Sequence, residues 1–225
     1  MSPADAAPLG PPVQDQRVYA HALLEQFEYR AGGSDSVSRW DGEAWLGTDT
    51  NRLWIRSEGE VNRHGEVADG QQELLYDRPI TSFFDLQTGL RLDLDSAAGR
   101  AWAAIGVEGL APEFLHVSAA AYAGDGGRFA AKLQLSCDEL VTQRWILQPE
   151  LELNAYSADD PSRRIGSGVS DLDAGLRLRY EIHRKLAPYL GLGFRRAFAR
   201  TAQYARADGD PAGTFSVLLG IRTWF

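Results

Sequence analysis

The stretch FFDLQTGLRLDL, residues 83–94, alternates apolar and polar side chains from Phe84 onward, with Thr88 as the one polar residue on the apolar parity. Because successive side chains of a β-strand point to opposite faces of the sheet, this segment has one mainly apolar face and one mainly polar face. Strands of soluble proteins usually have about five or six residues. A tilted strand that crosses a bilayer needs about nine to eleven. The length of the run therefore favours a membrane-spanning strand.

Other segments repeat the pattern. RFAAKLQLSCD (128–138) and DLDAGLRLRYEIH (171–183) alternate in the same way, and SVLLGIRTWF (216–225) places Val217, Leu219, Ile221 and Phe225 on one parity. The polar faces mix Arg, Asp and Glu with glycines, which suits a wet, ion-paired lumen. A soluble barrel would turn its apolar faces inward instead, and alternation alone does not separate the two. The length of the runs favours the membrane barrel.

We therefore predict an all-β fold, an antiparallel transmembrane β-barrel of outer-membrane type with about twelve strands. Ten strands is the alternative, because the first and fourth segments alternate poorly. Residues 1–16 are expected to form a disordered leader, and residues 17–225 the barrel. The expected strands are 18–30, 36–48, 50–62, 71–78, 83–94, 100–110, 114–124, 127–138, 143–156, 170–183, 186–199 and 214–225. Aromatic residues near the strand ends are expected to form interfacial girdles. They are Tyr19, Phe27, Tyr29, Trp40, Trp45, Phe83, Phe84, Phe114, Tyr156, Tyr189, Trp224 and Phe225.

Composition excludes several classes of protein. The formal net charge is −8, and no basic patch runs through the chain, which argues against a nucleic-acid partner. Cys137 is the single cysteine, so there is no disulfide within the chain and no cysteine-rich metal site. No run approaches the roughly 18 apolar residues of a transmembrane helix. Residues 1–16 also lack the basic and apolar regions of a signal peptide.

Five stretches, taken together, resemble the copper resistance protein B (CopB) family of Gram-negative outer membranes. They are ELLYDRPITSFFDLQTGLRLD (73–93), VTQRWILQPELELNAYS (141–157), IGSGVSDLDAGLRLRYEI (165–182), APYLGLGF (187–194) and GIRTWF (220–225). The resemblance implies a barrel in the outer membrane of a Gram-negative bacterium that takes part in copper resistance, by binding copper ions or by exporting them. The closing aromatic residue also resembles the signal by which such barrels are handed to the outer-membrane insertion machinery.

The sequence departs from that family at one point. Family members typically carry a Met- and His-rich segment before the barrel, which suits soft Cu(I). Residues 1–16 contain only Met1 and no histidine. Either this sequence is a shortened form or this member has no such segment. Any copper chemistry of residues 1–225 is then expected to rest on the barrel.

The four histidines, His21, His64, His116 and His183, show no local metal-binding spacing. His116 is the best placed of them to bind a metal ion, because it shares with Ser118 the strand face that is expected to point into the lumen. If LAPE (110–113) closes a hairpin, Glu108 falls opposite His116, and a turn at 95–99 places Asp85 opposite Glu108. The turn GDGG (124–127) places Gln134 near His116. We therefore predict a copper site at Asp85, Glu108 and His116, with copper of unknown oxidation state as its ion. The alternative is a lumen network without metal.

Three functions stay open. The first is a non-enzymatic copper-resistance barrel, whose expected partners are copper ions, outer-membrane lipids, the insertion machinery and periplasmic copper-handling proteins. The second is a small passive porin or structural barrel without a metal role. The third is a lipid-modifying enzyme, because the sequence HVS (116–118) resembles the His-x-Ser arrangement of outer-membrane phospholipases. Parity turns that pair inward, away from lipid, and no oxyanion site is evident. We therefore expect no catalysis.

Overall fold

The structure, a computed structural model, describes residues 17–32, 36–94, 99–183 and 185–225. The predicted leader at 1–16 lies outside these residues. The strands are β1 (Tyr19–Ala31), β2 (Val37–Gly47), β3 (Arg52–Asn62), β4 (Val67–Pro79), β5 (Phe84–Asp93), β6 (Arg100–Ala111), β7 (Leu115–Gly124), β8 (Phe129–Ser136), β9 (Glu139–Leu140), β10 (Trp145–Tyr156), β11 (Gly168–Tyr180), β12 (Leu186–Ala197) and β13 (Gly213–Trp224). One α-helix, α1 (Ala199–Ala207), is described.

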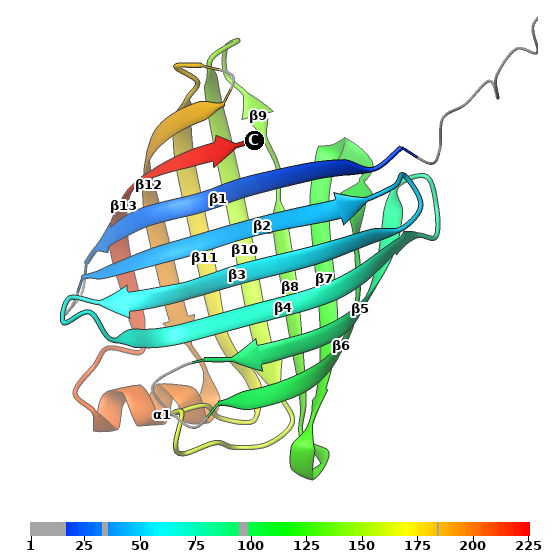
Figure 1. The fold of residues 1–225 in the computed structure, drawn as a ribbon. Helices are drawn as coiled ribbons and strands as arrows, with labels where there is room; N and C mark the ends of the chain where they lie inside the picture. Colours follow the sequence, from blue (N-terminus) through cyan, green and yellow to red (C-terminus); the bar gives the residue numbers. More distant parts are fainter. Residues whose placement is uncertain (1–16, 33–35, 95–98, 184) are drawn as a thin grey trace, which may run out of the picture.

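Twelve long strands close into an antiparallel barrel in the described part of the chain (Figure 1). Each pairs with its neighbours in sequence, and β1 closes the ring by pairing with β13. The two-residue strand β9 pairs only with the start of β10, and the ring continues from β8 directly to β10. The prediction of an all-β antiparallel barrel with twelve strands is confirmed.

The barrel has an apolar outer surface and a charged interior. On β13, Phe215, Val217 and Leu219 are 75%, 49% and 61% exposed, whereas Leu218, of the other parity, is buried. Inward-facing charged residues such as Arg177 and Glu28 are almost completely buried. Water would stabilise the reverse arrangement, so this surface suits the hydrocarbon of a bilayer. In the described part of the chain, no helix is both long and apolar enough to cross a membrane.

Exposed aromatic side chains lie near both ends of the strands. One group lies at the end that carries Tyr19 and Phe225, and a second at the opposite end, as interfacial girdles require. The first group comprises Tyr19, Phe83, Phe114, Trp145 and Phe225, and the second comprises Tyr29, Phe129 and Phe215. Among the aromatic residues expected in the girdles, Tyr189, Trp45 and Tyr156 belong to the interior instead, and Tyr156 packs against the buried cluster around Trp102. Tyr189 is buried and bonded to Glu28, and Trp45 packs against the buried Trp54.

The two ends of the barrel differ. The end near the C-terminus, which we call the terminal end, carries the connections 48–51, 80–83, 112–114, 137–144 and 181–185. The opposite end, which we call the α1 end, carries short turns such as 63–66 and 125–127 but also the two longest connections, 157–167 and 198–212, and α1 lies there (Figure 1). Outer-membrane barrels place short turns in the periplasm and longer loops outside. By that rule the terminal end faces the periplasm.

Candidate functional site

The lumen contains a cavity of about 380 Å³ that is rich in carboxylates. Eight acidic side chains line it, against three cationic ones (Arg56, Lys132 and Arg222) and one histidine, His116. The excess of negative formal charge is therefore five among the described lining residues. The acids are Glu25, Asp41, Glu43, Glu58, Glu73, Glu108, Asp138 and Glu150.

The cavity reaches the terminal end of the lumen and extends inward to Gln71 of β4 and Tyr122 of β7. Its lining includes His116 at the start of β7, Asp138 just after β8 and Arg222 near the end of β13. All three positions are at the terminal end, and His116 is exposed. A cation that approaches from this end therefore meets the carboxylates first.

A β-bulge in β1 adds one acid to the lining. The pairing of β1 with β2 shifts between Leu24 and Gln26, so Glu25 is the extra residue. Glu25 and Gln26 consequently both face the lumen, although they are neighbours in sequence. Glu25 accepts hydrogen bonds from Arg222 Nε at 2.7 Å and Gln148 Nε2 at 2.9 Å. The bulge explains why this segment alternates poorly in the sequence.

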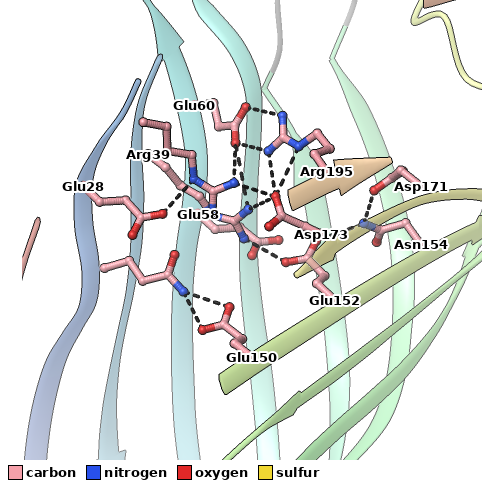
Figure 2. Close-up of polar contacts among 12 residues, drawn as sticks. Glu28, Arg39, Glu58, Glu60, Glu150, Glu152, Asn154, Asp171, Asp173 and Arg195 are labelled. Atoms are coloured by element: carbon pink, nitrogen blue, oxygen red, sulfur yellow. Dashed lines mark hydrogen bonds and ion pairs between the residues drawn. The ribbon is translucent and has the colours of Figure 1, made fainter. Parts of the chain in front are cut away.

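An ion-pair layer crosses the lumen between the cavity and the α1 end (Figure 2). Arg39 Nη2 donates to Glu152 Oε2 at 2.8 Å, and Arg30 Nη1 donates to Asp173 Oδ2 at 2.5 Å. Arg195 binds both Glu60 and Asp173. These groups come from six strands around the ring and point toward one another, which restricts the passage at this level. Mutual pairing offsets the desolvation cost of several kcal/mol for each buried ion.

Seven of the eight cavity carboxylates have a hydrogen-bonding or ion-pair partner among the described residues. The pairs are Glu25–Arg222, Glu43–Arg56, Glu58–Lys132, Glu73–Tyr122, Glu108–Arg56, Asp138–Arg179 and Glu150–Arg177. Asp41 is the exception, since the described residues provide no such partner for it. The lining acids are thus mostly bonded, as the sequence predicted, yet they outnumber the cations of the lining, and Asp41 has no such partner.

The structure corrects the predicted register around His116. Asp85 does lie opposite Glu108. Glu108, however, lies opposite Ser118, whereas His116 pairs with Leu110 and Ser136. The hairpin has a three-residue turn, Pro112–Phe114, in which Glu113 and Phe114 have φ of 65° and 57°. This longer turn shifts the pairing by two residues. The turn Asp125–Gly127 likewise places Gln134 opposite Ser118 rather than His116.

The predicted metal ligands have protein partners of their own. Asp85 Oδ2 accepts from Arg52 Nη1 at 3.0 Å, and Glu108 binds Arg56 and accepts from Gln87 Nε2 at 3.0 Å. Residues 17–32, 36–94, 99–183 and 185–225 contain no group of three His, Cys, Asp or Glu side chains arranged to hold a metal ion. Copper binding at Asp85, Glu108 and His116 stays a prediction.

The other histidines lie in three different surroundings. His64 lies in the turn between β3 and β4, as expected, and His183 follows β11. His21 stacks on Trp45, with ring centroids 6.1 Å apart. The Nδ1 atom of His21 is buried and has no hydrogen-bond partner among the described residues.

Sequence reasoning missed Asp41 and Gln71 as lumen residues of interest. A signal for Asp41 was present, since Arg39, Asp41, Glu43 and Trp45 share one parity in the predicted strand 36–48. No such signal marked Gln71. It stands next to a second glutamine, Gln72, so polarity does not tell which of the two faces inward.

Comparison with known proteins decides the family. The sequence model described as "Copper resistance protein B precursor (CopB)" matches residues 18–225. The chain belongs to the CopB family. The copper resistance protein B homolog of Pseudomonas syringae pv. tomato (strain ATCC BAA-871 / DC3000) is 38% identical over 216 residues, 96% of this chain and 73% of that protein. Copper resistance protein B of Escherichia coli is 37% identical over the same shares.

Solved porins share the fold of this CopB family member. The NanC porin matches with a TM-score of 0.57 at 12% identity, covering 91% of this chain and 99% of the porin. The KdgM porin matches with a TM-score of 0.53 at 11% identity, covering 89% and 98%. Family and fold together support a copper-resistance role and an outer-membrane location, and they suggest a non-enzymatic protein.

Proposed function

We propose that this barrel confers copper resistance by taking copper ions into its acidic cavity and passing them outward across the outer membrane of a Gram-negative bacterium. The observation that carries the proposal is the excess of five negative formal charges in a cavity at the terminal end. Such a cavity raises the local concentration of cations and disfavours anions. Because the terminal end is the periplasmic one by the rule of short turns, the ions would enter from the periplasm.

The ion-pair layer gives the proposal a second requirement. Copper held in the cavity is separated from the α1 end by Arg39, Glu60, Asp173 and their partners. Export therefore requires these pairs to rearrange, whereas sequestration does not. The proposed partners are copper ions, outer-membrane lipids, the insertion machinery and periplasmic proteins that deliver copper.

Growth and copper content of cells test the proposal. The chain is expressed in a Gram-negative strain that lacks its own copper resistance protein B, and assembly is checked by heat-modifiable migration on gels. We expect growth at higher copper concentrations than in cells with an empty vector, together with a lower cellular copper content. Raised tolerance with a higher copper content would indicate sequestration instead of export. Unchanged tolerance with a fully assembled barrel would contradict the proposal.

A passive porin is the second candidate, because the solved neighbours of the fold are porins. Single-channel recording in planar bilayers separates the two. A passive porin gives a steady potassium chloride conductance that copper does not change. The copper-resistance proposal expects a small conductance that micromolar Cu²⁺ reduces, because copper would occupy the carboxylate-lined cavity.

A further inference from the structure

Asp41 is the one cavity carboxylate without a bonding partner in the described part of the chain, although it lies inside the lumen. Its neighbours make this unusual, since every other acid that lines the cavity binds Arg, Lys or Tyr. A partly buried carboxylate without a cation is costly in a restricted lumen. A cation next to Asp41 would remove that cost.

Strand register gives Asp41 two oxygen-bearing neighbours. Asp41 of β2 lies directly opposite Glu58 of β3, and Glu58 lies directly opposite Gln71 of β4. All three line the cavity. Residues directly opposite in antiparallel strands have Cβ atoms about 4.5–5.5 Å apart, so adjacent side chains in this row are within contact range.

Gln71 supplies an independent observation. Its side chain is buried, with 6% exposed, it lines the cavity, and its Oε1 has no hydrogen-bond partner among the described residues. Gln26, at the other end of the row, differs: its Oε1 accepts from Arg177 and its Nε2 donates to Glu150. An unpaired amide oxygen next to Glu58, with Asp41 one strand further along the row, is a third oxygen donor available to a cation.

Lys132 already supplies one positive charge to this row. It reaches across from β8, and its Nζ binds Glu58 while lying 3.7 Å from Glu152 Oε1. Its single charge cannot neutralise both Asp41 and Glu58. If a divalent ion replaced it there, Lys132 would still have Glu152 as an ion-pair partner with little movement of the side chain.

We propose that Asp41, Glu58 and Gln71 bind a divalent cation, and that Lys132 is a tethered competitor that the ion displaces toward Glu152. Two carboxylates and an amide oxygen suit hard or borderline divalent ions, whereas soft Cu(I) prefers sulfur ligands. The ion is therefore copper as Cu(II). This last step rests on the proposed function, and the oxygen site itself does not.

Calorimetric titration of the detergent-folded barrel with Cu²⁺ tests the site, because its two key variants should act in opposite directions. Asp41→Asn keeps the shape but removes a charge, so affinity should fall by about tenfold or more. Lys132→Gln removes the competitor, so affinity should rise. A purely structural role of the network predicts that neither variant binds more tightly than the native protein. Asp125→Asn is the control, since it removes a charge from the exposed turn Asp125–Gly127, outside the cavity, and should leave affinity within about twofold.

Two results would overturn the site: equal Cu²⁺ affinity in the native protein and Asp41→Asn, or weaker binding by folded Lys132→Gln. Should Lys132→Gln fail to fold, Lys132→Met provides the same test. Mn²⁺, followed by its electron paramagnetic resonance, is a second probe, because it prefers oxygen ligands and reports little on His116. Asp41→Asn should weaken Mn²⁺ binding as well.

Different experimental results would reject the site and the proposed function. Full copper tolerance of cells that carry Asp41→Asn would reject the site as the copper carrier and leave the resistance role intact. Cells that gain no tolerance from the native chain would reject the role, even where the purified barrel binds Cu²⁺ or Mn²⁺ at Asp41.

Discussion

Single arginines hold the interior together. Arg177 is 1% exposed, and its guanidinium donates to Glu28 Oε2 at 3.0 Å, Glu150 Oε2 at 2.8 Å and Gln26 Oε1 at 3.0 Å. The planar fork of an arginine satisfies several acceptors at fixed angles, which an ammonium cannot do. Each such residue joins strands that are far apart in the sequence. Ion pairs across the lumen therefore connect these strands, in addition to the backbone hydrogen bonds between neighbouring strands.

Substitution of His116 tests the site predicted from the sequence. If Asp85, Glu108 and His116 ligate copper, His116→Ala should weaken Cu²⁺ binding, because imidazole is the only nitrogen ligand of the set. His64→Ala, in the exposed turn between β3 and β4, is the control and should bind as the native protein does. Calorimetric titration of both variants with Cu²⁺ in detergent measures the change in affinity. Equal affinity in the native protein and His116→Ala would exclude His116 as a ligand.

At the scale of elements, the sequence predicted most strands closely. The predicted segments 36–48 and 83–94 correspond to β2 and β5. Alternation of side-chain polarity identifies a strand that has one face toward lipid and the other toward the lumen. Strand β4 is longer than the predicted 71–78, because Asp69, Gly70 and the two glutamines interrupt the alternation. The helix α1 was missed, since ARTAQYARA reads as a polar loop and its position depends on tertiary contacts such as Thr201 Oγ1 with Gly166 N.

Register was harder to predict than the strands themselves. Parity decides which face a side chain occupies, and it correctly placed His116 and Glu108 in the lumen. The partner across the ladder depends on the number of residues in the turn. That number depended on two non-glycine residues, Glu113 and Phe114, adopting the left-handed conformation, which is uncommon outside glycine, Asn and Asp. A turn of this kind has no clear signature in the sequence.

The connection between β10 and β11 is anchored by one carboxylate, and this gives a prediction about pH. Asp160 accepts from Ser162 Oγ at 2.5 Å and from Arg128 Nη1 at 3.3 Å, and it binds Arg100 as well. Burial alone would raise the pKa of Asp160, but these hydrogen bonds and the nearby guanidinium charges outweigh it and lower the pKa to about 2. A lowered pKa in the folded state means that the anchor stabilises the loop above the ordinary carboxyl range and is lost as pH falls toward 2.

Hydrogen exchange of a peptide that spans 157–167 measures this anchor. After correction for intrinsic rates, protection in the native protein should persist from pH 7 to about 4 and decrease toward about pH 2. Asp160→Asn should lose that protection already at pH 7. Asp125→Asn is the control, since Asp125 lies in another connection at the α1 end and has no ion pair among the described residues. Undiminished protection in Asp160→Asn would show that other contacts hold the loop.

At the scale of the whole molecule, the lumen has two functional parts. The acidic cavity reaches the terminal end, and the ion-pair layer lies between its inner part and the α1 end. An open porin needs a continuous water-filled path, whereas this arrangement provides a binding chamber with a restriction beyond it. The bulge at Glu25 and the register at His116 both shape the chamber. The features that alternation in the sequence does not predict therefore lie at the proposed copper-binding cavity.

Removal of one arginine from the ion-pair layer should open the restriction in the lumen. Arg195 of β12 joins Glu60 of β3 to Asp173 of β11, and its side chain is 44% exposed at the edge of the layer. Arg195→Ala should remove one cationic partner from each carboxylate and leave a wider, more negative passage, while Arg30 still binds Asp173. Conductance in planar bilayers should then increase several-fold and become more selective for cations. The neighbouring Arg196→Ala is the matched control, because Arg196 is exposed and its guanidinium lies over Phe198. Equal conductance in the native protein and Arg195→Ala would mean that Arg30 and Arg39 close the lumen without it.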